Sequence, residues 1–246
     1  EICGIGIGSP GPLDKDKGII LNTPHLPHNT LLRKPLQDVT QLPIKIENDA
    51  NCFGLAEAHF GAAKSKKTVF GITLGTGFGS CLIISKKLFT GRGNATEFGH
   101  TTINFDEKKE KDGNTCQGSV EYYISKAAQV RYAEELGLCS MSPQETHVLA
   151  EQGNEKALAV FEKYGFYLGI ALANAINTFD PDTVVIGGAC SRSFPFFKNA
   201  MFEQLQQRCI VDIPEIKVSV LSEPGILGAA ALFNRSYFQR LVMPNF

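Results

Sequence analysis

The sequence predicts an α/β fold, in which strands and helices alternate along most of the chain. Runs rich in β-branched residues recur between longer stretches with helical spacing, after an opening portion that is mainly β. Several strand patterns end in glycine-rich turns, such as Gly187-Gly188, and ligands in α/β proteins bind at strand ends. An apolar fraction of 43% supplies enough material for a substantial hydrophobic core.

The first part of the chain predicts short strands followed by one helix. Strand patterns cover residues 2–7 and 18–22, and a third over 42–46 leads directly to Asp49. Apolar residues then recur at helical spacing, and Gly61 is placed to cap the end of that helix. We therefore expect Asp49 at a helix N-terminus.

The middle of the chain predicts a β-hairpin and a helix. Residues 68–74 and 79–84 are β-rich runs joined by the turn Gly75-Thr76-Gly77. A charged, weakly patterned segment over 106–114 predicts a solvated loop, and a helix over about 120–136 follows it. The tip of the hairpin is therefore a candidate phosphate-binding turn.

The last part of the chain returns to alternating helices and strands. Ser142-Pro143-Gln144-Glu145 predicts a helix start with a capping box. A long apolar helix is expected over about 155–179, then a buried strand over 183–186. A strand over 216–221 and a helix from about 227 complete the predicted elements.

Composition points to a small-molecule partner inside the cell. The 24 basic and 25 acidic residues are mixed along the chain and give a net charge of −1, which argues against nucleic acid or an anionic membrane as partner. The seven cysteines are an odd number without a Cys-x-x-Cys pair, which predicts reduced thiols and a cytoplasmic location. No apolar run approaches the roughly 20 residues that span a bilayer, and the first residues do not form a signal peptide.

The motif Glu47-Asn48-Asp49 at the strand-to-helix junction is a candidate catalytic site. The helix macrodipole favours an ionised Asp49, whose carboxylate could accept a proton from an alcohol while its oxygen attacks a phosphoryl group. Asn48 could hydrogen-bond the same hydroxyl or a neighbouring one. Asp and Asn also commonly serve only as helix caps, and the residue types alone leave both interpretations open.

The glycine turns carry a similar ambiguity. Gly75-Thr76-Gly77 can present unhindered amides and a hydroxyl to phosphate oxygens, or it can be an ordinary hairpin tip. Gly187-Gly188 either permits close approach to a nucleotide or makes a tight turn from strand to helix. Neither turn is a Walker A loop, so neither is decisive alone.

Glu97 and His100 lie three residues apart, near a glycine. Such a pair could bind a metal, or it could grip vicinal hydroxyls, with the carboxylate accepting hydrogen bonds and the imidazole donating or accepting. A structural histidine is the simpler alternative. The turn Ser9-Pro10-Gly11-Pro12 is typical of an ordinary loop when it is considered alone. Taken together, the acidic junction, the glycine turn and this pair predict a phosphoryl-transfer site that acts on a polyol.

These motifs resemble, over nearly the whole chain, the ROK family of bacterial repressors, open-reading-frame proteins and sugar kinases, and its glucokinase-like members in particular. The resemblance rests on Gly6-Ile7-Gly8-Ser9-Pro10-Gly11-Pro12-Leu13-Asp14, Glu47-Asn48-Asp49-Ala50-Asn51 with Ala56-Glu57, Leu74-Gly75-Thr76-Gly77-Phe78-Gly79, and Glu97-Phe98-Gly99-His100. It implies an actin-like ATPase (ribonuclease H-like) fold with two lobes and a central cleft for sugar and ATP. The lobes would be a small one, residues 1–48 with about 227–246 and incomplete at its N-terminus, and a large one, residues 49–226.

The resemblance also implies roles for individual residues. Asp49 looks like the catalytic base. Contacts with the sugar are implied for a second group: Gly11, Asn48, Glu97, His100 and Glu121. Contacts with the nucleotide are implied for a third group: Gly75, Thr76 and Gly77 at the phosphates, and Gly187 and Gly188 at the adenosine. Magnesium would arrive with ATP, and the family commonly forms homodimers.

The sequence departs from the family in the loop that usually holds zinc. That loop normally reads Cys-x-Cys-Gly-x-x-Gly-Cys-x-Glu, with a histidine as fourth ligand. Here residues 112–121 keep Cys116 alone, and Ser119 stands where a ligand is expected. One thiolate and one imidazole cannot complete a tetrahedral site, so we predict no structural zinc and a His100 that is free to serve the sugar.

The second departure concerns the first phosphate motif of the family, Asp-x-Gly-Gly-Thr, which belongs upstream of Glu1. The chain starts without methionine, directly in a strand pattern, and we expect it to be a fragment of a longer kinase. The function predicted from these observations is ATP-dependent phosphorylation of a hexose at its 6-hydroxyl, most favourably glucose, as in glycolysis. Three alternatives stay open: a kinase for N-acetylmannosamine, mannose or fructose; a polyphosphate donor; and a ROK-type sugar-responsive regulator or inactive sugar-binding protein.

Overall fold

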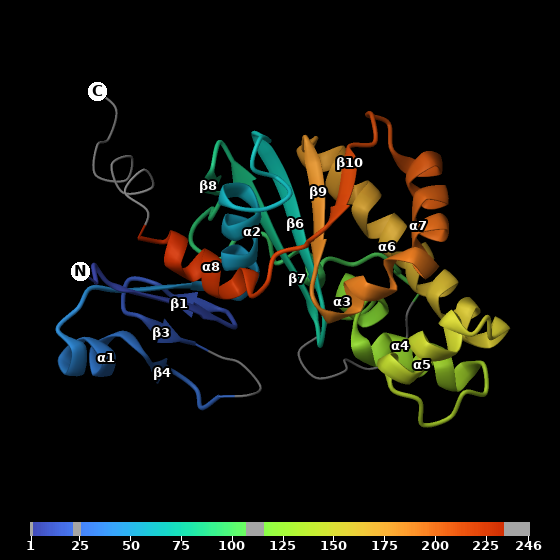
Figure 1. Ribbon diagram of the computed structural model, residues 1–246, viewed down its shortest axis with the longest axis horizontal. Helices are drawn as coiled ribbons and strands as arrows, with labels where there is room; N and C mark the ends of the chain where they lie inside the picture. Colours follow the sequence, from blue (N-terminus) through green and yellow to red (C-terminus); the bar gives the residue numbers. More distant parts are fainter. Residues whose placement is uncertain (1, 22–25, 107–115, 234–246) are drawn as a thin grey trace. The chain divides into compact units, whose positions relative to one another are not determined.

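The chain divides into two compact units in the computed structural model, which describes residues 2–21, 26–106 and 116–233 (Figure 1). The first unit comprises residues 1–71, 80–96 and 219–246, and the second comprises 72–79 and 97–218. Strands β6 (Thr68–Leu74) and β7 (Phe78–Ile84) contribute residues to both units. The predicted division into lobes stays a prediction, and its boundary after residue 48 falls inside the first unit.

Two small sheets form the β part of the first unit. Strands β1 (Ile5–Ser9) and β5 (Ile44–Asn48) pair in parallel, with Ser9 opposite Asn48 at their ends. An antiparallel sheet follows, made of β2 (Leu13–Asp14), β3 (Ile19–Ile20) and β4 (Thr30–Leu31), and helix α1 (Arg33–Thr40) comes after it. Apolar side chains from both sheets share one core, made of Leu13, Ile20, Ile44 and Ile46 with Ile5, Ile7 and Leu32 against it.

Helix α2 (Asp49–His59) packs against helix α8 (Pro224–Ala231) in the same unit (Figure 1). All residues of α2 from position 50 to 58 are buried, so this helix has no polar face and serves as a core element. The predicted cap at Gly61 is wrong, because α2 ends at His59 and Phe60 is its cap. Gly61 instead lies against Glu57, whose Oε2 atom would be 2.2 Å from a Cβ at position 61.

One five-stranded sheet carries the hairpin. Its strand order is β10 (Glu215–Val218), β9 (Thr183–Gly187), β6, β7 and β8 (Lys87–Leu88). Strands β9 and β10 are parallel, and β7 and β8 are antiparallel. Because β6 and β7 are neighbours joined by residues 75–77, the predicted hairpin is confirmed.

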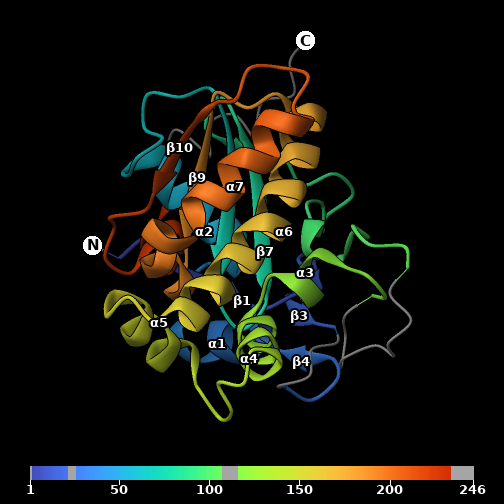
Figure 2. The same ribbon diagram turned by 90° about the vertical axis from the view of Figure 1, so that its right-hand side faces the viewer.

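Helices make up most of the second unit, with α6 and α7 side by side (Figure 2). The α-helices are α3 (Val120–Tyr123), α4 (Lys126–Glu135), α5 (Pro143–Glu151), α6 (Glu155–Phe179) and α7 (Phe194–Arg208); the 3₁₀ helices are η1 (Phe98–His100) and η2 (Ala189–Ser193). Ser142 and Glu145 form the predicted capping box, and α6 has the predicted bounds.

The helix predicted over 120–136 is two helices. Ile124 leaves the helical conformation, and Ser125 starts α4 by accepting a hydrogen bond from the amide of Ala128 at 3.2 Å. Periodicity alone misses this break, because the apolar spacing continues through it. Strand β10 also ends at Val218 rather than at 221.

Two α-helices in the described part of the chain were not predicted, α1 and α7. Both carry a proline near their start, Pro35 and Pro195. A proline is tolerated there because the first amides of a helix have no acceptor within the helix. In the sequence, however, a proline is also typical of a loop, so these helix starts were missed. Residues 107–114 of the predicted loop and the last part of the predicted C-terminal helix, 234–246, lie outside the described residues. Within the described ranges, no helix is both long and apolar enough to cross a bilayer.

Candidate active site

Strand β5 meets helix α2 at the Asn48-Asp49 pair. Asn48 is the N-cap: its side-chain oxygen accepts the amides of Ala50 at 2.9 Å and Asn51 at 3.2 Å. Asp49 is the first helical residue, and its Oδ1 atom accepts the Ala50 amide at 2.8 Å. Because Asn48 caps the helix, the interpretation that Asp49 is present only as the cap loses its main support.

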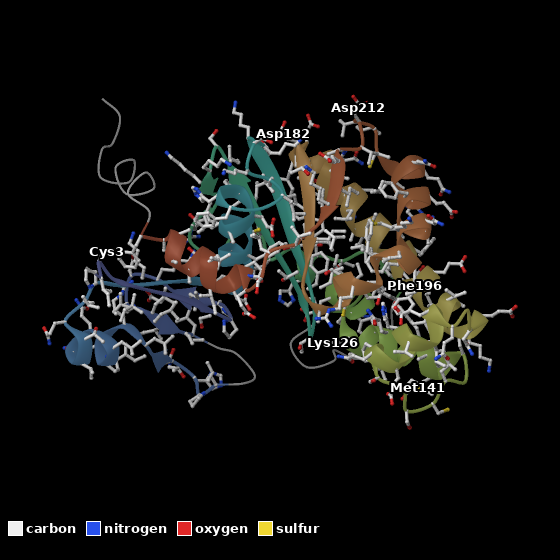
Figure 3. All side chains as sticks on the ribbon, in the orientation of Figure 1. Cys3, Lys126, Met141, Asp182, Phe196 and Asp212 are labelled. Atoms are coloured by element: carbon white, nitrogen blue, oxygen red, sulfur yellow. The ribbon has the colours of Figure 1, made fainter. Side chains whose placement is uncertain are left out.

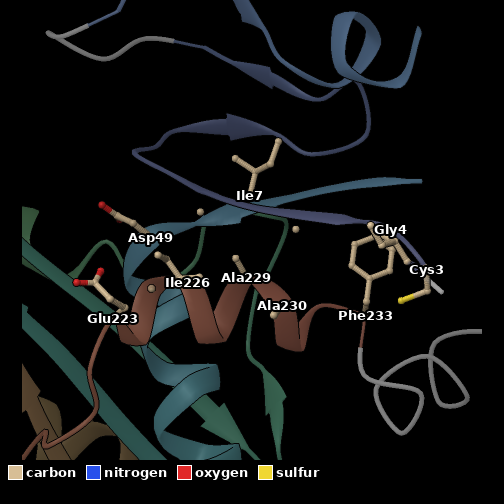
Figure 4. A pocket seen from close by; sticks show the side chains of 13 residues that line it. Cys3, Gly4, Ile7, Asp49, Glu223, Ile226, Ala229, Ala230 and Phe233 are labelled. Carbon is tan, nitrogen blue, oxygen red and sulfur yellow. The ribbon is translucent and has the colours of Figure 1, made fainter. Parts of the chain in front are cut away.

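Asp49 lies at the end of a cavity of about 710 Å³ between β1 and α8, beside Glu223 (Figure 4). Its side chain keeps an exposed surface, but the walls of the cavity reduce its hydration. This burial raises the pKa of Asp49 above its ordinary value, and the hydrogen bond from the Ala50 amide opposes the shift. A carboxylate with a raised pKa is a stronger proton acceptor, which suits a general base.

Gly11 belongs to the same part of the first unit. The parallel strands β1 and β5 end together at Ser9 and Asn48, so the turn that contains Gly11 leaves the sheet at the edge where Asn48 and Asp49 begin α2. The side-chain amide of Asn94 binds both the N–H and the C=O of Leu13, each at 3.1 Å. The turn is therefore fixed from both sides, by the sheet and by Asn94.

The turn from Gly75 to Gly77 presents bare backbone amides. Gly75 donates to the carbonyl of Gly77 at 3.1 Å, whereas the amides of Thr76 and Gly77 find no acceptor within the described residues. The next amide, that of Phe78, donates to Oε2 of Glu121 at 2.8 Å. A Cβ at position 77 would lie 2.2 Å from the same oxygen, so a larger residue at this position would push the Glu121 side chain away. Glu121 therefore anchors the turn.

The second glycine pair lies directly against the end of β6. Gly188 has φ +84°, and a Cβ there would lie 2.4 Å from the backbone oxygen of Leu74. Leu74 immediately precedes Gly75, so the structure brings the two predicted nucleotide segments together within the second unit. Sequence reasoning predicted each turn, but their proximity depends on β9 pairing beside β6.

A cavity of about 270 Å³ opens beside this glycine pair, between α4, α5 and η2. Its polar lining includes Lys126, which begins α4 and is labelled in Figure 3, and also His147, Arg192 and Ser193. The Nδ1 atom of His147 lies 2.9 Å from Oγ of Ser193, and Nε2 lies 3.5 Å from Oε1 of Glu151. None of these residues was singled out in the sequence, because a lone histidine on a helix carries no distinguishing pattern.

Glu97 and His100 bracket the short helix η1. The Oε2 atom of Glu97 and the Nε2 atom of His100 are 3.9 Å apart, which is too long for a hydrogen bond. The Nδ1 atom of His100 is buried without a hydrogen-bond partner in the part of the chain that the structure describes. No group of three or more metal-ligating residues occurs there. The buried Nδ1 atom of His100 therefore suits a contact with a hydroxyl group.

The predicted site residues thus fall into two sets. Gly11, Asn48 and Asp49 lie in the first unit. The rest lie in the second unit: Gly75, Thr76, Gly77, Glu97, His100, Glu121, Gly187 and Gly188. Within the second unit, Glu121 meets the glycine turn, and Gly188 meets the strand that leads into this turn. The sugar-binding roles of Glu97, His100 and Glu121 stay predictions. In the loop that usually holds zinc in this family, residues 112–115 lie outside the described residues, and Cys116 is an exposed free thiol.

This arrangement of strands, helices and glycine turns is that of an actin-like ATPase. The crystal structure of a ROK family glucokinase from Streptomyces griseus, in complex with glucose and AMPPNP, is similar, with a TM-score of 0.84 and 28% identity over 94% of this chain and 81% of that chain. The ROK family model matches residues 1–236. The chain belongs to the ROK family, and both the predicted resemblance and the predicted fold are confirmed.

Its relatives include regulators and kinases. The chain is 33% identical to the xylose repressor of Bacillus subtilis over 84% of its own length, and 30% identical to the glucokinase of Thermotoga maritima over 93%. It covers 78% of that glucokinase but only 53 to 62% of three xylose repressors. The family thus joins sugar kinases and sugar-responsive regulators.

Proposed function

We propose that the protein is a glucokinase-like sugar kinase, which transfers the γ-phosphoryl group of ATP to the 6-hydroxyl of a hexose, most favourably glucose. The observation that carries this proposal is Asp49. A regulator requires no catalytic base. Yet this carboxylate belongs to the first residue of a helix and is not the cap of that helix, its pKa is raised, and it lies at the end of a cavity. These are the properties that a base for alcohol attack requires.

In the proposed reaction, the Asp49 carboxylate accepts the proton of the sugar hydroxyl as its oxygen attacks the γ-phosphorus in line. The bond from phosphorus to the bridging oxygen breaks, and ADP leaves with that oxygen. Asn48, Glu97, His100 and Glu121 would hold the other hydroxyls, and Gly11 would lie close to the sugar. Positioning supplies much of the rate in such reactions, because the protein does little covalent chemistry.

The donor is proposed to be a nucleotide rather than polyphosphate. The amides of Thr76 and Gly77, which find no acceptor among the described residues, fit phosphate oxygens, and the nearby cavity of about 270 Å³ carries two cationic side chains, Lys126 and Arg192. Polyphosphate would have no use for a separate cavity beside Gly188. Magnesium would enter with ATP and neutralise charge on its phosphates.

A second candidate is a sugar-responsive regulator, which the similarity to xylose repressors favours. The two candidates differ in what precedes the chain in its gene. An Asp-x-Gly-Gly-Thr motif behind a short leader supports the kinase, and a helix-turn-helix region supports the regulator. A natural start near Glu1 supports an inactive sugar-binding protein.

The direct test is a coupled assay of ADP release by the complete gene product with ATP and magnesium. Glucose, mannose, fructose, N-acetylglucosamine, N-acetylmannosamine and xylose form the panel, with Asp49→Asn as matched control. Sugar-dependent turnover that Asp49→Asn abolishes supports the kinase and identifies its substrate. Thermal stabilisation by a sugar without turnover would contradict the kinase and favour the regulator. The predicted homodimer is tested by sedimentation of the same sample.

A further inference from the structure

An ion pair in the first unit involves the residue that immediately precedes the candidate catalytic residues Asn48 and Asp49. The Nζ atom of Lys15 is 2.7 Å from Oε1 of Glu47, and these side chains are only 22% and 7% exposed. The neighbouring pair of Lys17 with Asp14 has side chains that are 73% and 24% exposed. The two lysines are two residues apart in the same loop. The position of the loop therefore does not explain why one lysine is more buried than the other, and the contact with Glu47 does.

The carboxylate of Glu47 holds the strand-to-helix junction through one oxygen. In addition to its ion pair with Lys15, the Oε1 atom accepts hydrogen bonds from the backbone amide of Asn48 at 2.8 Å and the side-chain amide of Asn51 at 2.9 Å. Asn48 is the N-cap of α2, and Asp49 follows it. The Lys15 ammonium thus contacts the same carboxylate oxygen that accepts the Asn48 amide. That hydrogen bond sets the direction in which Asn48 and Asp49 leave the strand.

The charges around this junction are concentrated. Burial, followed by the carboxylates of Glu47 and Asp49, raises the pKa of the Cys52 thiol to about 12, whereas Lys15 lowers it. The carboxylates of Glu47 and Asp49 thus both lie near the buried Cys52 thiol, and Lys15 supplies the opposing positive charge. Without this cation, Glu47 would be a buried carboxylate that lacks its counterion, which is strongly unfavourable.

We propose that Lys15 and Glu47 are a positioning pair for the phosphoryl-transfer site. Lys15 holds Glu47 in place, and Glu47 holds Asn48 and Asp49 in the orientation that they need for the sugar hydroxyls. Neither residue touches the reacting atoms. This inference rests on the proposed function for its kinetic consequences, but its structural consequence can be measured without turnover.

The loop itself does not depend on the Lys15 side chain. The Arg33 guanidinium donates to the backbone carbonyls of Lys15 and Asp16, and the Lys17 amide donates to Oδ1 of Asp14 at 2.9 Å. Replacement of the Lys15 side chain should therefore leave the backbone of the loop in place. The loss is expected at the junction, where Glu47 is free to turn away from Asn48.

The test compares Lys15→Met with Lys17→Met and Lys15→Arg in the complete gene product. For Lys15→Met, we expect kcat to fall and KM for the sugar to rise, each by about tenfold or more, because small displacements of catalytic groups are costly. KM for ATP should not change. Lys17→Met should behave as the parent protein, and Lys15→Arg should recover most of the activity, because a guanidinium can also pair with Glu47.

A purely structural role would give a different pattern. It would lower the fraction of active protein, and hence the apparent kcat, without changing KM for the sugar. That result, or equal effects of Lys15→Met and Lys17→Met, would overturn the proposal. If Lys15→Met cannot be obtained folded, Lys15→Met/Glu47→Gln removes both charges, and the same joint shift of kcat and KM is expected; parental constants in this variant would also overturn it.

Amide hydrogen exchange separates this inference from the proposed function. We expect Lys15→Met to accelerate exchange at Asn48, Ala50 and Asn51, and not in α1 or at the C-terminal end of α2. If the parent protein transfers no phosphate, the proposed function fails, and local acceleration still supports the positioning pair. Unchanged exchange at these amides would overturn the pair in either case.

Discussion

Glu121 offers a quantitative test of the site, because it has both an observed contact and a predicted one. Its Oε2 atom accepts the amide of Phe78, a residue that is 5% exposed, and this bond anchors the glycine turn. Its second oxygen is available for the predicted contact with a sugar hydroxyl. The variants Glu121→Ala and Glu121→Gln separate these two roles.

Glu121→Ala leaves the Phe78 amide without its charged acceptor. Hydrogen bonds to charged groups contribute about 1.5 to 3 kcal/mol, and for a chain of this size each kcal/mol shifts the melting temperature by roughly 2 to 4 °C. The expected decrease is therefore roughly 3 to 12 °C. The Gln side chain retains an acceptor oxygen, so Glu121→Gln should lose less than about half of that amount.

The assay combines thermal melting with steady-state kinetics. In Glu121→Ala, KM for ATP should rise because the turn that would hold the phosphates loosens. In Glu121→Gln, KM for ATP should change little, while KM for the sugar should rise if the second oxygen serves the sugar. A Glu121→Ala variant that melts at the parental temperature would refute the reasoning, because the anchoring bond would then contribute nothing.

Three further predictions address other parts of the site. Asp49→Asn should abolish phosphorylation but preserve sugar binding by calorimetry, because the amide cannot accept the proton; near-parental turnover would remove Asp49 from the mechanism. The raised pKa of Asp49 predicts that kcat/KM declines on acidification at a higher pH than an ordinary aspartate would give, since the base must be ionised; a pH–rate profile that is flat in this region would contradict it. Gly188→Ala should lower the melting temperature and raise KM for ATP, because its Cβ would meet the Leu74 oxygen at 2.4 Å; Gly153→Ala, which also has positive φ but open space around it, is the control, and equal effects on KM would argue against a nucleotide role.

Local patterns in the sequence were sufficient to locate most elements. The capping box at Ser142 and Glu145, the long helix before Asp180 and the hairpin around Gly75 each depend on residues close together in the chain, and each is present in the structure. The failures were also local. A break at Ile124 and a helix that begins beside Pro195 are decided by caps and packing that apolar periodicity does not register.

The sequence by itself determined the fold class, the family and the position of each motif along the chain, because spacing and residue type carry that information. Only the tertiary structure decided which groups meet. Phe78 and Glu121 are 43 positions apart, Lys15 comes from the turn after β2 whereas Glu47 lies in β5, and His147 reaches Ser193 across 46 positions. Such contacts depend on how strands pair and helices pack, and a group's neighbours in space set its hydration, its partners and its pKa. The functional meaning of Asp49 and the glycine turns therefore depends on folded surroundings that no local pattern specifies.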